Sequence, residues 1–400
     1  MAVNAQPGLR LGLCPRAHTP VNCPHAHEPL AQRRGVSRAL SNTAGLARLI
    51  TCVLLMPAAA AGASSAAGLT AMPRITVHGR QFYSGNRSWR AWGMNWGVGD
   101  HAPVNAYFDD PSAANLAVLR AELRTAKGMG ANSMRIYLQL GQFMATPTRP
   151  RQSSLIALKR LLAVAEQARI YLDVTGDLVW QPRSAPAWYA HMRWQERWRV
   201  QARFWRAVAH AAAPSPAVLC YELTSEPIVA HTPGYYYGHT GNWWFVQSIA
   251  PAPAREADAL ARAWTRLMAT AVRSQDDRPV SIGLLPMTTG PFRPANIATQ
   301  LDAVVVHVYP TAGHAPAAIA TIRAFAATHK PLLLGETFIL FDDAATQYAF
   351  LTGAAQYLAG AFEFFDGRDP RTIHVHTIYD AIYQACLEQF MTLRHLVTSR

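Results

Sequence analysis

The chain of 400 residues contains only three lysines, so its basic excess is carried almost wholly by arginine. The formal net charge is +13. Residues 1–63 supply +5 of it, from six arginines and one glutamate, and no run of basic residues occurs in the remainder. A nucleic-acid-binding face needs clustered Lys and Arg. We therefore expect no nucleic-acid partner.

Cysteine is scarce where a metal site or a disulfide framework would need it. Three of the five cysteines lie within residues 1–63, which leaves Cys220 in an apolar run and Cys386 in an expected C-terminal helix. No Cys-x-x-Cys pair and no Cys/His set is present. The sequence predicts no metal and no cofactor, and it leaves open whether Cys220 and Cys386 pair or remain free thiols.

The N-terminal region contains one apolar run, residues 49–61, which is short for a membrane span and interrupted by Pro57. Arginines precede this run and small residues follow it, which is the order of a secretory signal. We expect cleavage near Ala63 and a secreted or periplasmic protein. The alternative is an uncleaved anchor, and a membrane partner is expected only in that case.

The whole chain is expected to divide into three parts. Residues 1–63 are expected to be a disordered leader with a signal peptide, residues 64–72 a linker, and residues 73–400 a single catalytic domain. We expect this domain to be monomeric.

Strand-like and helical patterns alternate along the domain. A hairpin is expected over residues 75–83, and eight apolar runs follow at 89–96, 132–138, 170–174, 217–226, 279–285, 301–308, 331–336 and 360–365. Continuous apolar runs are typical of parallel strands buried on both faces. Eight strands with helices between them predict a (β/α)8 TIM barrel with an N-terminal β-hairpin. The alternative is a doubly wound sheet, but the first run is not followed by a glycine-rich phosphate loop.

The first helix of this pattern should begin at a recognisable signal. Asp110 followed by Pro111 is typical of an N-cap residue and a first-turn proline.

Two glutamates 110 residues apart each end an apolar run. Glu226 ends the run 217–226, and Glu336 ends the run 331–336. Residues at the C-terminal ends of barrel strands face the active site. Two facing carboxylates there can cleave a glycosidic bond, one as acid and one as nucleophile. A buried Glu226 would hold a proton, whereas Glu336 would stay ionised if hydrogen-bond donors surround it.

Polar residues at other strand ends could supply those donors. Arg135 lies in an apolar run and needs an anionic partner. That partner is either a carboxylate in the barrel mouth or Glu222, as a structural ion pair lower in the barrel. His307 and Tyr309 share one face of their strand. Tyr309 could bind the nucleophile and His307 could orient the acid, although a satisfied core histidine is the alternative.

Aromatic residues could form a sugar platform. The loop after Glu226 contains Trp243 and Trp244 in an aromatic-rich stretch, residues 235–245. Aromatic faces stack on the CH faces of sugars, but such a loop could equally pack its aromatics on one another. Trp96 and Trp180 carry the same ambiguity.

These motifs together resemble glycoside hydrolase clan A, and most closely family 5, the cellulase and mannanase family. The resemblance covers about residues 73–370. Its pieces are Gly93-Met94-Asn95-Trp96, Asn132 with Arg135, Ser225-Glu226-Pro227, His307-Val308-Tyr309 and Gly335-Glu336. It implies that Glu226 is the acid/base and Glu336 the nucleophile of a retaining hydrolase. It also implies that Arg135, His307 and Tyr309 support them.

Three departures from the family pattern stand out. Ser225 replaces the usual Asn before the acid/base, the usual His after the third strand is absent, and Phe364 lies where a strand-eight Trp is usual. We expect a β-linked glucan or mannan oligo- or polysaccharide as substrate. Asn95, Trp96, Trp180, Ser225, Trp243, Trp244 and Phe364 are the expected substrate-binding or supporting residues. The alternative is a weakly active or non-catalytic glycan-binding barrel.

Overall fold

The computed structural model describes one compact unit within residues 68–400. The described residues are 71–96, 103–177, 185–230, 247–337, 339, 342–365 and 367–399.

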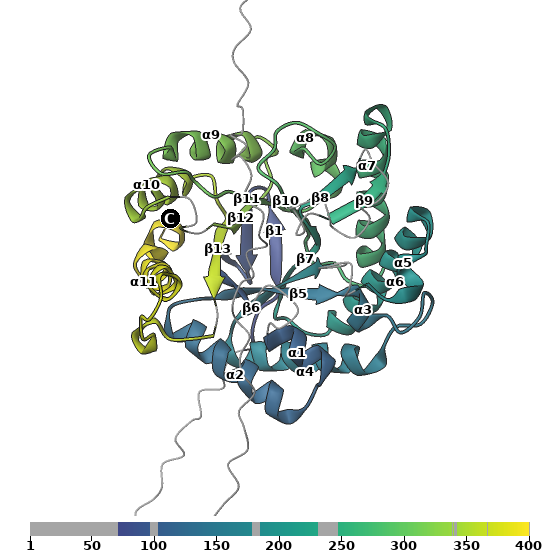
Figure 1. Ribbon diagram of the computed structural model, residues 1–400, viewed down its shortest axis with the longest axis horizontal. Helices are drawn as coiled ribbons and strands as arrows, with labels where there is room; N and C mark the ends of the chain where they lie inside the picture. The colour runs from purple at the N-terminus through teal and green to yellow at the C-terminus, as the bar shows by residue number, and fades with distance from the viewer. Residues whose placement is uncertain are drawn as a thin grey trace, which may run out of the picture. The chain divides into compact units, whose positions relative to one another are not determined.

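Eight parallel strands close into a barrel that is ringed by helices (Figure 1). The strands are β4 (Ala91–Trp96), β5 (Ser133–Gln139), β6 (Tyr171–Asp177), β7 (Val218–Ser225), β10 (Val280–Leu284), β11 (Val304–His307), β12 (Leu332–Glu336) and β13 (Gly360–Phe365). They follow one another around the barrel in chain order, and β13 closes it by pairing with β4. The predicted (β/α)8 barrel is confirmed.

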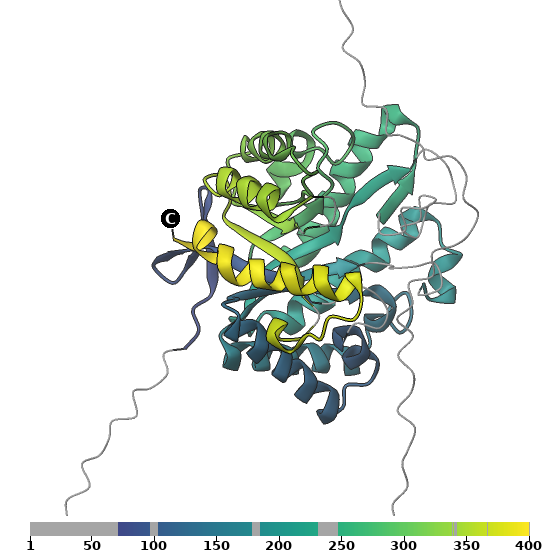
Figure 2. The same cartoon turned by 60° about the vertical axis from the view of Figure 1, so that its left-hand side comes forward.

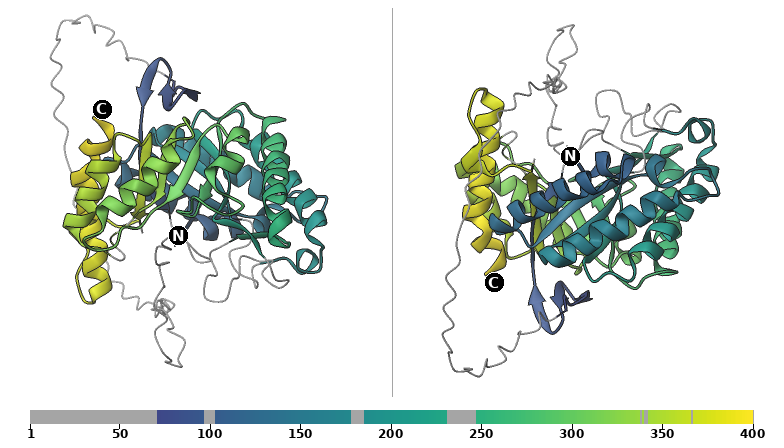
Figure 3. Two further views of the ribbon diagram at one scale, coloured as in Figure 1. Left: turned by 90° about the horizontal axis from the view of Figure 1, so that it is seen from above. Right: turned by 90° about the horizontal axis from the view of Figure 1, so that it is seen from below.

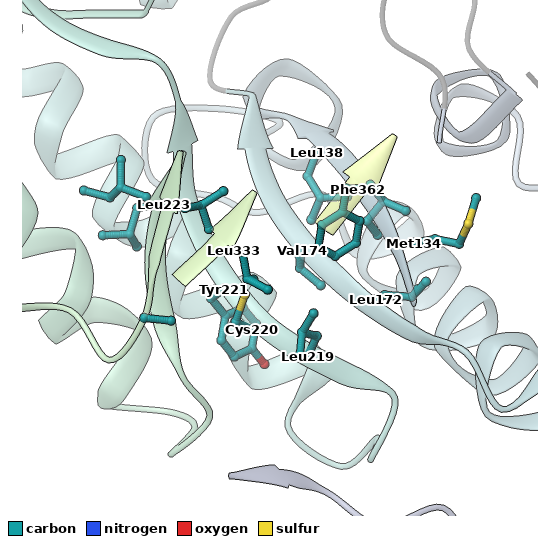
Figure 4. Packing of buried hydrophobic residues seen from close by; sticks show 14 of the residues in the cluster. Met134, Leu138, Leu172, Val174, Leu219, Cys220, Tyr221, Leu223, Leu333 and Phe362 are labelled. Atoms are coloured by element: carbon teal, nitrogen blue, oxygen red, sulfur yellow. The ribbon is translucent and has the colours of Figure 1, made fainter. Parts of the chain in front are cut away.

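The barrel strands are mostly apolar because both of their faces are buried. Every residue of β5, β6 and β7 is buried, which explains why their sequences lack the alternation of a half-exposed strand. Side chains such as Leu172, Val174, Leu223 and Phe362 pack together around these strands (Figure 4). Burial of this apolar surface drives the barrel to close.

The helices around the barrel vary in length. They are α1 (Pro103–Asp109), α2 (Ala113–Gly128), α3 (Leu140–Phe143), α4 (Gln152–Ala168), α5 (Ala187–Ala190), α6 (Trp194–Ala212), α7 (Ala254–Arg273), α8 (Pro294–Ile297), α9 (Ala315–Ala326), α10 (Ala344–Ala354) and α11 (Ile378–Thr398), with 3-10 turns η2 (Ala298–Gln300) and η3 (Pro370–Thr372). None of the helices within the described ranges is long and apolar enough to cross a membrane.

The expected helix start at Asp110 and Pro111 is wrong. The short helix α1 already ends at Asp109, and the Asp110 amide still donates to Ala106 O at 2.9 Å. The N-cap of α2 is Ser112, whose hydroxyl accepts the Asn115 amide at 3.3 Å. Both serine and aspartate are good N-caps, so propensity alone did not separate the two positions.

The predicted hairpin is part of a three-stranded antiparallel sheet, β1 (Ile75–His78), β2 (Gln81–Ser84) and β3 (Arg87–Trp89). It lies beyond one end of the barrel (Figures 2 and 3). Tyr171, the first residue of β6, donates to Pro73 O at 2.7 Å and packs edge-on against Trp89. The sheet therefore covers the N-terminal ends of the strands, opposite the end where Glu226 and Glu336 lie.

Two further features were not specified by the sequence. A pair of parallel strands, β8 (Pro227–Ala230) and β9 (Gln247–Pro251), stands outside the barrel directly after Glu226. Cys220 and Cys386 are both buried free thiols, which settles the alternative left open above.

Candidate active site

The two glutamates converge at the C-terminal end of the barrel. One oxygen of Glu226, one oxygen of Glu336 and a ring nitrogen of His307 all lie within 4.8 Å of one another. Glu226 follows β7, Glu336 ends β12, and His307 ends β11, so three separate strand ends position the group. Both carboxylates are largely removed from solvent, which makes their interactions stronger than in water.

The surroundings of Glu226 raise its pKa. Its Oε1 is 2.7 Å from His307 Nδ1, and its Oε2 has no hydrogen-bond partner within the described part of the chain. Burial raises the pKa of Glu226, the contact with His307 lowers it in part, and the charge of Glu336 raises it again. The net effect is a pKa above the usual value for a glutamate, which is the direction that a general acid requires.

The backbone of Glu226 is left-handed, with φ of +50°. This conformation is uncommon for a residue with a Cβ. It occurs where β7 ends and β8 begins, and the Glu226 amide is fixed there by Gly283 O at 2.8 Å. The turn aims the side chain across the barrel mouth toward His307, so the strain coincides with the chemistry.

This strain gives a testable prediction. The free energy of unfolding in urea should be about 1 kcal/mol higher for Glu226→Gly than for Glu226→Ala, because glycine tolerates positive φ and alanine does not. Both variants lose the same carboxyl group, so the comparison isolates the backbone. The matched control is Glu388 in helix α11, where alanine should be the more stable replacement. Equal stability of the two Glu226 variants would contradict the assigned strain.

The surroundings of Glu336 lower its pKa instead. Its Oε1 accepts hydrogen bonds from Arg135 Nη1 at 2.6 Å and from the Tyr137 hydroxyl at 2.9 Å, and its Oε2 accepts one from the Tyr309 hydroxyl at 2.7 Å. Burial would raise its pKa, but the positive charges of His307 and Arg135, with the Tyr309 hydrogen bond, lower it to about 2. Glu336 is therefore ionised at neutral pH.

Arg135 contacts both of the partners that the sequence allowed. It is fully buried and binds Glu222 through Nη2 and through Nε at 3.2 Å, while Nη1 binds Glu336. The pair with Glu222 anchors the guanidinium, and its far end reaches Glu336. Gly283 lies directly against this pair, and a Cβ there would collide with the Glu222 carboxylate.

Tyr137 was missed by the sequence reasoning. It lies two residues after Arg135 on β5, and alternation places both on the inner face of the barrel. A tyrosine within an apolar strand looks like core, so the available signal was this spacing. Its hydroxyl is 2.7 Å from Asn95 Oδ1 as well as 2.9 Å from Glu336.

Asn95 was expected to bind or support substrate, and the structure gives it a supporting position. It is fully buried, accepts hydrogen bonds from Arg135 at 2.9 Å and from Tyr137, and donates to Gly335 O at 3.0 Å. These bonds occupy both ends of the amide. Asn95 thus fixes the residues that bind Glu336.

Ser225 and Trp96 lie in different surroundings. The Ser225 hydroxyl accepts a long hydrogen bond from Arg135 Nη2, at 3.4 Å, beside the site.

Trp96 is only 1% exposed and donates its indole N–H to Glu122 at 2.5 Å. Neighbouring strand residues face opposite ways, so with Asn95 inward Trp96 must point outward. The expectation that Trp96 lines the glycan site is corrected accordingly.

The remaining aromatic candidates cannot be placed at the site. Trp180, Trp243 and Trp244 lie outside the described residues. The backbone of Phe364 lies on β13 in register with Asn95, and its side chain is outside what the structure describes.

An open cavity of about 570 Å³ lies where β5 ends. Its lining includes Phe108, Asp109, Gln139, Gln142 and Arg151. Gln139 is two residues beyond Tyr137 on the same strand, so the cavity begins beside the C-terminal end of β5. Glu226, His307 and Glu336 are not among its lining residues.

Glu226, His307 and Glu336 are also spaced so that they could surround a metal ion. The donors around Glu336 do not favour such a role. Both of its oxygens accept hydrogen bonds, one of them from the guanidinium of Arg135, and a cation would have to displace these donors and face that positive charge.

Comparison with solved structures identifies proteins of the same fold at low sequence identity. The exo-β-1,4-mannosidase Op5Man5 from Opitutaceae bacterium strain TAV5 has a TM-score of 0.59 at 15% identity, covering 81% of this chain and 63% of that chain. A GH5_18 protein from Bifidobacterium longum subsp. infantis gives 0.57 at 13% identity, covering 78% and 80%. The β-1,4-mannanase of the sea hare Aplysia kurodai gives 0.56 at 13% identity, covering 80% and 97%.

This chain therefore spans less than two thirds of the length of the Opitutaceae protein. At these identities the likeness shows the (β/α)8 fold. No model of a known protein family matches the sequence, and no curated protein sequence matches it.

Proposed function

We propose that the protein is a retaining glycoside hydrolase that cleaves a β-linked glycan. Glu226 is the acid/base and Glu336 is the nucleophile. The observation that carries the proposal is a pair of adjacent buried carboxyl groups whose pKa values are displaced in opposite directions. Such a pair supplies one proton donor and one anion at the same pH, which glycoside cleavage needs.

The spacing of the pair supports retention. Inverting enzymes separate the carboxyl groups by about 6.5–9.5 Å to leave room for water, and retaining enzymes by about 5–5.5 Å. Oxygens of Glu226 and Glu336 within 4.8 Å of each other fit the shorter spacing.

The reaction then has two steps. Glu336 attacks the anomeric carbon while the bond to the leaving group breaks and the leaving oxygen takes the proton of Glu226. A water molecule next attacks the same carbon, gives a proton to Glu226 and releases Glu336 as a carboxylate. His307 orients Glu226 throughout, and Arg135 and Tyr309 hold Glu336 in place.

The substrate class is proposed from the solved neighbours. An exo-β-1,4-mannosidase and a β-1,4-mannanase are among the similar structures, which favours a β-mannan-like glycan. A β-glucan-like glycan is the alternative.

The proposal is tested with aryl β-mannosides and β-glucosides and with the corresponding β-1,4-oligosaccharides. Release of a β-configured product, followed by NMR before mutarotation, would support retention. Release of the α-anomer would overturn it. Binding of the oligosaccharides without turnover would favour a non-catalytic glycan-binding barrel, and loss of activity with a chelator would favour a metal-dependent hydrolase.

The pH dependence follows from the two displaced pKa values. The rate kcat/KM should fall as pH rises through the raised pKa of Glu226 and as pH falls toward the pKa of Glu336, about 2. Tyr309→Phe removes a donor to the Glu336 anion, so the acidic limb should move up by about one pH unit. Tyr221→Phe removes a hydroxyl bound to Asp276 instead and should leave the profile unchanged. An unmoved acidic limb in Tyr309→Phe would contradict the assignment.

We also propose that the protein is exported and loses residues up to about Ala63. N-terminal sequencing of the exported protein tests this proposal. An intact leader in the membrane fraction would favour an anchored form.

A further inference from the structure

The hydroxyl of Tyr137 has two acceptors within reach and one proton to give. Glu336 Oε1 is 2.9 Å away and Asn95 Oδ1 is 2.7 Å away. Tyr137 is only 4% exposed, so solvent does not satisfy the hydroxyl. Its pKa lies well above the usual range, chiefly because the ring is buried, and it therefore keeps its proton. At any moment the proton points at either Glu336 or Asn95.

The two oxygens of Glu336 have different neighbours. Oε2 accepts from Tyr309 and lies 3.7 Å from His307 Nδ1, which is itself 2.7 Å from Glu226. Oε2 is thus the oxygen on the side of the acid/base. Oε1 is occupied by Arg135 and Tyr137. The bond to the sugar therefore forms at Oε2, and Oε1 becomes the carbonyl oxygen of the glycosyl ester.

From this geometry we propose that Tyr137 is a catalytic residue whose hydroxyl turns from Glu336 to Asn95 when the glycosyl ester forms, and back when the ester breaks. The inference rests on the proposed function. The O–H bond of Tyr137 stays intact throughout. In the first step the bond between Oε2 and the anomeric carbon forms, and the leaving oxygen takes the proton of Glu226. In the second step that bond breaks as water attacks and returns a proton to Glu226.

Charge explains why the hydroxyl turns. A carboxylate accepts a much stronger hydrogen bond than a neutral ester carbonyl. Once the charge of Glu336 is lost, the amide oxygen of Asn95 becomes the better acceptor, and it is held in place because Asn95 also donates to Gly335 O. The buried O–H of Tyr137 therefore always has an acceptor, and a buried donor without one would be unfavourable.

The benefit falls on the second step. Negative charge returns to Glu336 as the ester breaks, so the hydrogen bond from Tyr137 is regained in that transition state. An interaction that is stronger in the transition state than in the preceding intermediate accelerates the step. In the first step the same bond holds the ground-state anion, so Tyr137 should help that step little.

The test is Tyr137→Phe, assayed on aryl β-glycosides with graded leaving groups. With good leaving groups the second step limits turnover, and kcat should fall about tenfold. The rate kcat/KM, which reports the first step, should change less than about threefold, and a burst of aryl alcohol with glycosyl-enzyme visible by mass spectrometry should appear. Tyr221→Phe is the matched loss of a buried tyrosine hydroxyl and should show neither change.

The outcomes separate the inference from the proposed function. If the wild-type protein turns over none of these substrates, the proposed function fails and the inference fails with it. If the wild type is active but Tyr137→Phe slows both steps equally, or lowers only thermal stability as Tyr221→Phe does, the inference alone is overturned. A selective loss of the second step, with an accumulated intermediate, supports it.

Discussion

Glu336→Gly is expected to lower turnover of aryl β-glycosides by about 10⁴-fold or more, the scale observed when a covalent nucleophile is removed. The fold should persist, because Arg135 keeps its buried partner Glu222 when Glu336 is gone. The truncated side chain leaves space on the nucleophile side of the sugar. Added azide should enter that space and restore cleavage of substrates with good leaving groups, and the product should be the α-glycosyl azide.

Two comparison variants sharpen this test. Glu336→Gln should be equally inactive but insensitive to azide, because the amide still fills the space beside Arg135 and Tyr309. Glu226→Ala should spare substrates whose leaving group needs no protonation, and azide should then give the β-glycosyl azide through the glycosyl-enzyme. Wild-type activity in Glu336→Gly, or the same azide product from both variants, would show that the roles are assigned wrongly.

A second large effect is expected at Glu363, on β13 but outside the catalytic cluster. The side chain is 3% exposed, and its Oε1 has no partner within the described part of the chain. Burial, and then the charge of Asp342, raise its pKa from 4.5 to about 8. Burial and the charge of Asp343 raise the pKa of Asp342 to about 7, and the Cys386 thiol, on α11, lies in the same surroundings.

The sign of the effect on stability follows directly. Between about pH 4.5 and pH 8 the folded state holds a proton on Glu363 that the unfolded state releases, so stability falls as pH rises and levels off above pH 8. At about 1.36 kcal/mol for each unit, the loss is of order 3–5 kcal/mol. Glu363→Gln removes the charge, and it should unfold at higher urea than wild type at about pH 8.5.

At about pH 5 the wild type and Glu363→Gln should be nearly equal, because the native carboxyl is then neutral as well. Glu388→Gln, on the exposed surface of α11, is the matched control and should leave the pH dependence unchanged. A residual slope is expected in Glu363→Gln from Asp342. An identical slope in wild type and Glu363→Gln would contradict the raised pKa.

Much of the fold could be predicted because barrel strands leave a strong pattern. Each of the eight runs is mostly apolar, and its order along the chain is also its order around the barrel. The start of helix α2 was predicted wrongly because it depends on a small free-energy difference. Ser112 and Asp110 are comparable N-caps, and only the presence of α1 decides between them.

The site was partly predictable for a similar reason. Arg135 lies within an apolar strand, and Glu226, His307 and Glu336 lie at the ends of such strands. Burial of these polar residues is unfavourable without a partner. Tyr137 was missed because a tyrosine within an apolar strand is typical of a core residue. Glu363 was missed because β13 was considered only as a source of aromatic side chains that bind sugars. Trp96 was expected at the same site as its neighbour Asn95, although strand alternation places neighbouring residues on opposite faces.

The pairing of β13 with β4 has a consequence for how the chain acquires its structure. The register that joins Gly360 to Ala91 links residues from opposite ends of the domain, so the barrel cannot close until β13 has been synthesised. Contacts of such long sequence separation form slowly, and until then β4 and β12 present open edges that invite aggregation. Trp92, stacked on Phe390 of α11 at 4.7 Å, connects the same two ends and should report the closing event by its fluorescence. A chain that ends before Gly360 should therefore accumulate as aggregates rather than as a smaller folded protein.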